Sequence, residues 1–176
     1  MNKILIRTEV LKGLQSCMPK KTEAGREVLR NLYFCGSSLY ATDGRILIKV
    51  NSESFSGADL KPDSIYEILK MVKDSKDFTM ITLEKVDGQY PAVAKIFEGI
   101  KTDSVKSFTS DLSAGTSIST VIIKTYKMSE QAYDYILVYR LSCMKTFWTV
   151  YPQKVGVLYL KSEMAEALVT RYNIEI

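Results

Sequence analysis

A short polar turn between two apolar runs constrains the fold of this chain more than any other feature. Residues 38–41 and 46–50 both have the composition of strands, and the tetrapeptide between them is Thr42-Asp43-Gly44-Arg45. Asp-Gly is typical of a turn that needs positive φ, because glycine adopts that conformation without steric cost and aspartate can bond to its own backbone. The sequence therefore predicts a tight β-hairpin here.

The residues before the hairpin predict a strand, a helix and another strand. Residues 4–7 are expected to form the first strand. Residues 9–18 carry apolar side chains at helical spacing, with Thr8 as a plausible N-cap and Pro19 as a stop. Residues 28–34 are expected to form the next strand.

The region after the hairpin has a less regular pattern. Apolar spacing predicts a second helix over residues 62–73, followed by an alternating strand over residues 78–85. Residues 103–120 are rich in serine, threonine and glycine and are interpreted as a loop or strand edge, ending at a strand-like segment, residues 121–123. A third helix is expected over residues 129–140. The closing strands are predicted at residues 147–151, 155–160 and 167–174.

Composition excludes several classes of protein. With 176 residues, of which 46% are hydrophobic, the chain can bury the core of one domain. No apolar run approaches the roughly 20 residues that a membrane-spanning helix needs. Residues 1–7 do not have the pattern of a signal peptide. We therefore expect a cytoplasmic protein without a membrane partner.

The chain has no obvious catalytic or metal-binding set. It contains no histidine, which excludes Ser-His-Asp and Cys-His arrangements. Cys17, Cys35 and Cys143 are far apart in sequence and are interpreted as free thiols rather than metal ligands. Asp63 and Glu67 lie four residues apart on a predicted helix, a spacing typical of a solvated face. We expect neither an enzyme nor a metal or other cofactor, although a carboxylate site in a deep pocket stays an alternative.

The hairpin also supports a resemblance to a known family. The string Leu39-Tyr40-Ala41-Thr42-Asp43-Gly44-Arg45-Ile46-Leu47 resembles the L-x-A-T-D-G-x-R-L hairpin of bacterial sliding clamps, the processivity subunits of replicative DNA polymerase. It has one residue fewer between Gly44 and Arg45 than the clamp motif. In this interpretation the tetrapeptide is a structural motif.

Three later segments resemble clamp motifs in the same order. Residues 88–97 are similar to the G-x-F-P-x-Y-x-x-V-I segment, and residues 126–141 to the helix F-N-x-x-Y-L-x-D-A-L. Residues 157–161 and 167–172 resemble the closing strand pair, with Thr170 in place of the usual proline. The resemblance implies an α+β, DNA-clamp-like fold with two helix-plus-antiparallel-sheet halves.

The length suggests a single clamp-like domain over residues 1–176. Its expected parts are a first half (1–52), an inserted or divergent helix–strand segment (53–100), a loop (101–120) and a second half (121–176). Clamp rings hold several such domains, so a ring would need several copies that associate edge to edge.

Charge points to a possible polyanion partner. The net charge of +4 is mildly basic, and positive residues gather around the first two predicted helices. Clamp helices present Lys and Arg to the phosphates of duplex DNA without reading bases. The resemblance implies this role for Arg7, Lys12, Lys20, Lys21, Arg26, Lys70 and Lys73. Ordinary solvated side chains are the alternative.

Two classes of function stay open. The first is a non-catalytic DNA replication accessory protein, of a phage or mobile element, that contacts duplex DNA and a DNA polymerase or other replication protein. The second is a clamp-fold interaction module, a monomeric adaptor or regulator without DNA binding. The motifs do not assign a peptide pocket to particular residues. Trp148 and the eleven tyrosines allow base stacking as a further role, although most tyrosines in alternating strands are half-buried.

Overall fold

This computed structural model describes residues 1–57, 59–103, 105–112, 115–153 and 156–171, and strands hold more of these residues than helices do. The strands are β1 Asn2–Arg7, β2 Leu32–Cys35, β3 Ser38–Thr42, β4 Ile46–Asn51, β5 Phe55–Gly57, β6 Ser64–Lys73, β7 Phe78–Val86, β8 Phe108–Asp111, β9 Phe147–Pro152, β10 Val157–Lys161 and β11 Ala165–Thr170. The helices are α1 Thr8–Ser16, α2 Val93–Glu98, α3 Gly115–Ser129 and α4 Tyr135–Arg140, with the 3-10 turns η1 Glu27–Arg30, η2 Ser52–Ser54 and η3 Leu141–Met144.

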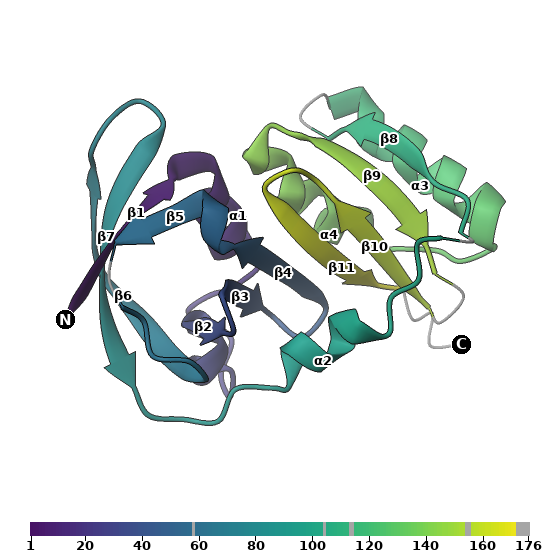
Figure 1. Cartoon of the computed structure of the whole chain (residues 1–176). Coiled ribbons are helices and arrows are strands. Elements are labelled where there is room, and N and C mark those ends of the chain that lie inside the picture. The colour runs from purple at the N-terminus through teal and green to yellow at the C-terminus, as the bar shows by residue number, and fades with distance from the viewer. Residues whose placement is uncertain (58, 104, 113–114, 154–155, 172–176) are drawn as a thin grey trace.

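All these strands join one curled antiparallel sheet. Its order is β5-β1-β7-β6-β2-β3-β4-β11-β10-β9-β8. β1 to β7 and α1 form a first unit, and β8 to β11 with α3 and α4 form a second (Figure 1). The two units meet where β4 pairs with β11, with Ile48 opposite Ala167 and Leu47 opposite Leu168. The fold is therefore α+β with two helix-plus-sheet halves, as the sequence predicts.

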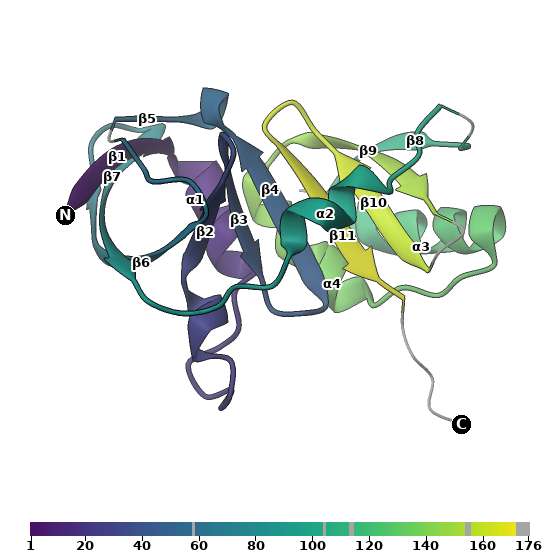
Figure 2. The ribbon, with the colours of Figure 1, turned by 60° about the horizontal axis from the view of Figure 1, so that its bottom comes forward.

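The helices cover the two faces of the sheet differently. α1, α3, α4 and η3 bury apolar side chains in one large core, to which they contribute Val10, Leu14, Val121, Leu137 and Met144. α2 lies on the opposite face, where Val93 packs in a second core with Tyr40, Leu47, Tyr159 and Leu168. Figure 2 shows α2 in front of β4 and β11, while α3 and α4 lie behind the sheet. No described helix combines the length and apolar composition that a bilayer crossing needs.

The predicted helix over residues 62–73 is wrong, because this segment forms β6. It pairs with β7 and, at its start, with β2. Ser64, Ile65 and Tyr66 are consecutive and all buried, whereas an amphipathic helix would expose one of them. Short apolar runs fit both periods, and long-range pairing decides between them. Lys70 and Lys73 therefore lie on a strand.

The loop predicted over residues 101–120 is also wrong in part. It contains β8 and the start of α3, and the strand-like residues 121–123 lie inside α3. Ile118, Val121 and Thr125 are buried at helical spacing, while Ile123 is 55% exposed. Packing of this buried face overrides the β propensity of Val and Ile.

The third predicted helix, residues 129–140, is helical only at its C-terminal end. Ser129 ends α3, and Glu130 has φ of 56°, a left-handed conformation that interrupts the helix. α4 begins at Tyr135, where Asp134 Oδ1 accepts a hydrogen bond of 2.9 Å from the Ile136 N–H. Asp134 is therefore the N-cap of α4.

The structure confirms the hairpin, as β3 and β4, and the strands β1, β9, β10 and β11. α1 is confirmed as well, although Thr8 is its first residue and bonds through its hydroxyl to Thr79. Only the end of the strand predicted at residues 28–34 is extended, because residues 27–30 form η1. Residues 53–100 supply β5, β6, β7 and α2. The predicted strand ends at residues 155 and 172–174 lie outside the described residues.

Candidate functional site

The hairpin turn is held by side-chain hydrogen bonds to its own backbone. Asp43 Oδ1 accepts from the N–H groups of Arg45, at 2.8 Å, and Ile46, at 3.1 Å. Thr42 Oγ1 donates to the Ile46 carbonyl at 2.7 Å and accepts from the Gly44 N–H at 2.9 Å. Gly44 has φ of 92°, which explains why glycine suits this position. The turn is rigid because its polar groups are paired within a few residues.

Asp43 also joins the two units. Its side chain is fully buried, and its Oδ2 lies 2.5 Å from Nη1 of Arg140 at the end of α4. Burial alone would raise the pKa of Asp43, but the Arg45 and Ile46 N–H groups and the Arg140 charge outweigh it, so this pKa is lowered. The carboxylate is therefore charged at neutral pH and fixes the hairpin against the second unit.

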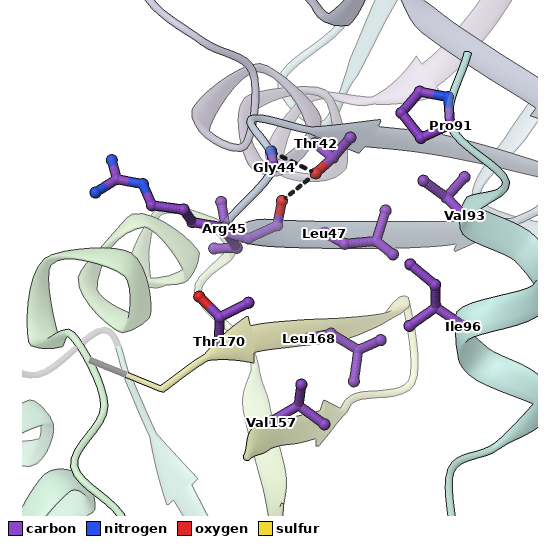
Figure 3. A pocket seen from close by; sticks show the side chains of 11 residues that line it. Thr42, Gly44, Arg45, Leu47, Pro91, Val93, Ile96, Val157, Leu168 and Thr170 are labelled. Carbon is purple, nitrogen blue, oxygen red and sulfur yellow. Dashed lines mark hydrogen bonds between the residues drawn. The ribbon is translucent and has the colours of Figure 1, made fainter. Parts of the chain in front are cut away.

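A small apolar cavity, which we call the junction pocket, lies beside this hairpin where the two units meet. Its volume is about 190 Å³, and it is lined by Thr42, Gly44, Arg45, Ile46, Leu47, Pro91, Val93, Ile96, Val157, Leu168 and Thr170. Figure 3 shows Leu47, Val93, Ile96 and Leu168 pointing toward one another, while the Arg45 guanidinium extends away from them. The walls thus come from β4, β10, β11 and α2.

Contacts on the face of the sheet that α2 covers hold this helix over the junction pocket. The Phe97 ring lies 6.2 Å from that of Tyr40, and Lys49 Nζ is 5.5 Å from the Phe97 ring centre. Lys49 in turn pairs with Glu166 at 2.9 Å, and Tyr159 donates to the same carboxylate at 2.6 Å. The wall formed by Val93 and Ile96 is therefore anchored to β4, β10 and β11.

The chemistry of the junction pocket suits binding rather than catalysis. Among the described residues, its lining includes no carboxylate, thiol or amine, and the only charged one is Arg45, whose side chain is 53% exposed. The Thr170 N–H is already bonded to the Arg45 carbonyl at 3.0 Å. A preformed apolar cavity with a few polar groups at its rim accepts an apolar side chain of a ligand.

Two of the residues predicted to bind DNA share a second cavity with two cations outside the predicted DNA-binding set. Arg7 and Lys12 line it with Lys76 from the β6–β7 turn and Lys145 after η3. We call this cavity, of about 210 Å³, the cation pocket; its other lining residues are Thr8, Glu9 and Asp77. No ion pair between described residues involves any of these four cations. Lys145 follows α4 and η3, so only the folded chain brings it to α1.

The other predicted DNA-binding residues are dispersed. Lys20 and Lys21 are exposed in the segment after α1, and Lys70 and Lys73 are exposed on β6. Arg26 has an internal role, because its Nη1 donates to the Asp43 carbonyl at 2.7 Å and pairs with Glu23 at 3.2 Å. The structure therefore does not gather the seven residues into one site.

The residues considered for catalysis or metal binding are held by contacts within the protein or are buried. Asp63 lies in the turn before β6, where it accepts a hydrogen bond of 3.3 Å from the Tyr33 hydroxyl. Burial raises the pKa of the Cys17 thiol to about 12, so this cysteine is not a reactive thiolate. The described residues contain no group of three or more potential metal ligands. Trp148 is fully buried and takes no part in stacking with a ligand.

Comparison with solved structures identifies the fold. The chain superposes on DNA polymerase III subunit beta from Borrelia burgdorferi with a TM-score of 0.59 and 11% identity, covering 98% of this chain and 64% of that chain. A Helicobacter pylori beta clamp bound to a DNA ligase peptide gives 0.55 and 13%, covering 99% and 67%. The Thermotoga maritima beta subunit gives 0.53 and 11%, covering 100% and 66%.

This chain thus has the sliding-clamp fold and spans about two thirds of the length of those clamps. No family model and no curated protein matches the sequence. At this level of identity the likeness concerns the fold alone.

Proposed function

We propose that this chain is a non-enzymatic accessory protein of DNA replication that captures a short peptide of another replication protein in the junction pocket. The observation that carries this proposal is an apolar cavity between two clamp-like units, beside the Thr42–Arg45 turn. A Helicobacter pylori clamp of the same fold is bound to a DNA ligase peptide. Such a role belongs in the cytoplasm, and an origin in a phage or mobile element stays a prediction.

The size of the cavity limits the expected affinity. Burial of one Leu or Phe side chain contributes about 1.5–3 kcal/mol, and the pocket has room for few such groups. Ordering a flexible peptide opposes binding. We therefore expect a dissociation constant on the order of 1–100 μM, which suits a contact that forms and dissociates repeatedly.

The test is fluorescence anisotropy with a labelled peptide that has the sequence of the DNA ligase segment bound by the Helicobacter pylori clamp. Ile96 is 50% exposed on α2 and lines the pocket, so Ile96→Glu should abolish binding without unfolding the chain. Ile123 is 55% exposed on α3, away from the pocket, and Ile123→Glu is the matched control. Equal binding by the wild type and both variants would exclude the junction pocket as the peptide site.

Contact with nucleic acid is a second candidate function. The supporting observation is the cation pocket, where Arg7, Lys12, Lys76 and Lys145 converge without ion pairs between described residues. Phosphate groups are the ligands that such a cluster would attract, with Lys20, Lys21, Lys70 and Lys73 as more distant contributors. Arg26 is less suited to the role because its guanidinium is engaged by Asp43 and Glu23. Binding to a 20-base-pair duplex should weaken steeply with salt, and Lys12→Glu/Lys145→Glu should weaken it further.

Self-association is a further part of the proposal. β5 and β8 are the two end strands of the sheet that the described residues form, and the ends of a sheet are where a strand of another copy can add. Light scattering on a sizing column distinguishes a closed oligomer, which would favour encirclement of DNA, from a monomer, which would favour the adaptor alternative.

A further inference from the structure

The second unit exposes an unusual set of large apolar side chains on its helices. On α3 these are Ile123 and Tyr126, each 55% exposed. On α4 they are Tyr135 (62%), Ile136 (50%) and Tyr139 (60%). We call these five residues the tyrosine face. Clustered exposed apolar side chains commonly mark a binding surface.

The tyrosine face points away from the sheet. α3 buries Ile118, Val121 and Thr125, and α4 buries Leu137 and Val138, all on the side of the large core. The exposed residues therefore lie on the opposite side of each helix, toward solvent. α3 contacts α4, so these exposed sides belong to two neighbouring helices.

The helices α3 and α4 carry positive charges, and the acidic residues lie between them. α3 and α4 contain Lys124, Lys127 and Arg140 and no acidic residue. Lys124 lies over the Phe108 ring, at 5.4 Å, and Arg140 is paired with Asp43, which leaves Lys127 available to a ligand. The acidic residues between the helices are Glu130 and Asp134, and Asp134 is committed to capping α4.

The tyrosine face continues into the cation pocket. α4 runs directly into η3, which packs against α1, and Lys145 follows η3. The same side of the sheet thus carries exposed tyrosines at one end and Arg7, Lys12, Lys76 and Lys145 at the other. Aromatic faces beside a cationic groove are the two components of surfaces that bind single strands without sequence preference.

We propose that this helix-covered side binds single-stranded nucleic acid, with phosphates at the cation pocket and Lys127, and with bases stacked on Tyr126, Tyr135 and Tyr139. A duplex would use only the cations, because its bases already stack on each other. A second copy of the chain is a less suitable occupant, because it would supply no phosphate groups to the four cations of the cation pocket. The inference rests on the nucleic-acid contact proposed above and is independent of the junction pocket.

The experiment compares fluorescein-labelled (dT)20 with a 20-base-pair duplex by anisotropy, at low and moderate salt. Each stacked base contributes about 1–3 kcal/mol, so Tyr135→Ala/Tyr139→Ala should weaken (dT)20 binding by at least about 30-fold and duplex binding by less than about 3-fold. Tyr135→Phe/Tyr139→Phe retains both rings and should stay within about twofold of wild type. Both tyrosines are mostly exposed, and a thermal melt of each variant checks that the fold is kept.

Three results would overturn the inference. Unchanged (dT)20 binding by the alanine variant would exclude base stacking on Tyr135 and Tyr139. Duplex binding would then still stand as the second candidate function. The molar mass of the wild type is also measured in solution at several protein concentrations. If this mass rises with concentration for the wild type but not for the alanine variant, and (dT)20 binding is unchanged, the face is a contact between copies of the chain. Failure of the wild type to bind either nucleic acid would remove both nucleic-acid proposals and leave peptide binding untouched.

Discussion

Asp43 and Arg140 are 97 residues apart in sequence, yet their side chains meet at 2.5 Å between the hairpin of the first unit and the last turn of α4 in the second. The pair lies next to the junction pocket, whose lining includes Thr42, Gly44 and Arg45. A contact that joins the two units, in addition to the β4–β11 pairing, therefore lies beside one wall of the candidate binding site.

Removal of the Asp43 side chain should destabilise the protein strongly. Asp43→Ala leaves Arg140 without its partner and two backbone N–H groups without acceptors, for an expected loss of about 3–5 kcal/mol in the free energy of unfolding. Arg45→Ala is the control, because Arg45 is 53% exposed and lies 3.8 Å from the same carboxylate. Its loss should stay below about 1 kcal/mol. Urea titration measures both, and similar losses would contradict the role given to the Asp43–Arg140 pair.

Stability should fall in acid. Burial would raise the pKa of both Asp43 and Glu166, but hydrogen bonds and nearby cations lower both values. A carboxylate with a lowered pKa stabilises the folded state above its unfolded pKa, about 3.9 for Asp, and this stabilisation is lost as the pH falls through the folded value. The free energy of unfolding should thus decrease below about pH 4. Asp43→Asn should show a smaller acid-induced decrease than wild type, and an equal decrease would assign the effect to other groups.

Gly57 should tolerate no side chain. Its φ is 132°, and a Cβ there would lie 2.6 Å from the Lys3 carbonyl oxygen, a backbone atom that cannot move aside. Gly36→Ala is a matched control, since Gly36 has φ of 60° with no atom within 4 Å of the added Cβ. The control should cost about 1–2 kcal/mol, and Gly57→Ala at least about 2 kcal/mol more. Equal losses in urea titration would mean that β5 does not approach β1 as described.

Phe97 should affect peptide binding from outside the pocket. Phe97→Ala removes its contacts with Tyr40 and Lys49, which hold α2 and hence Val93 and Ile96 in place. We expect peptide affinity to fall by about 3- to 10-fold, with a smaller effect on unfolding than a substitution in the large core. Anisotropy and urea titration on the same variant measure the two quantities. An unchanged affinity would mean that α2 keeps its position without these contacts.

Trp148 should report unfolding but not binding. The only tryptophan of the chain is fully buried in β9. Acrylamide should quench its fluorescence weakly in the native state and strongly in urea, and saturating (dT)20 should leave it unchanged. Strong quenching of the native protein would contradict the packing of β9 against α3.

Local sequence chemistry predicted the parts of the fold that depend on near neighbours. The Thr42–Arg45 turn pairs its own polar groups, and α1 has a complete apolar stripe, so both could be predicted without tertiary information. β6 could not, because its apolar residues fit a helix as well as a strand and only pairing with β2 and β7 decides. The helix α3 could not be predicted for the converse reason. Its β-branched residues favour a strand, and the segment is helical because one side of it is buried in the core.

The candidate sites depend even more on long-range packing. The clamp-like segments at residues 88–97, 157–161 and 167–172 already contained Val93, Val157 and Leu168, but their order in the chain does not show that they line one cavity. Lys145 gave no signal in sequence, because its meeting with Arg7 and Lys12 requires α1 and η3 to pack together.

The most direct test of the central claim is a ¹H–¹⁵N NMR titration with the DNA ligase peptide described above. If the junction pocket binds the peptide, the largest amide shifts should fall on Gly44, Leu47, Val93, Ile96 and Leu168, and α3 and α4 should stay unperturbed. Shifts confined to the tyrosine face, or no shifts at millimolar peptide, would contradict peptide capture between the two units.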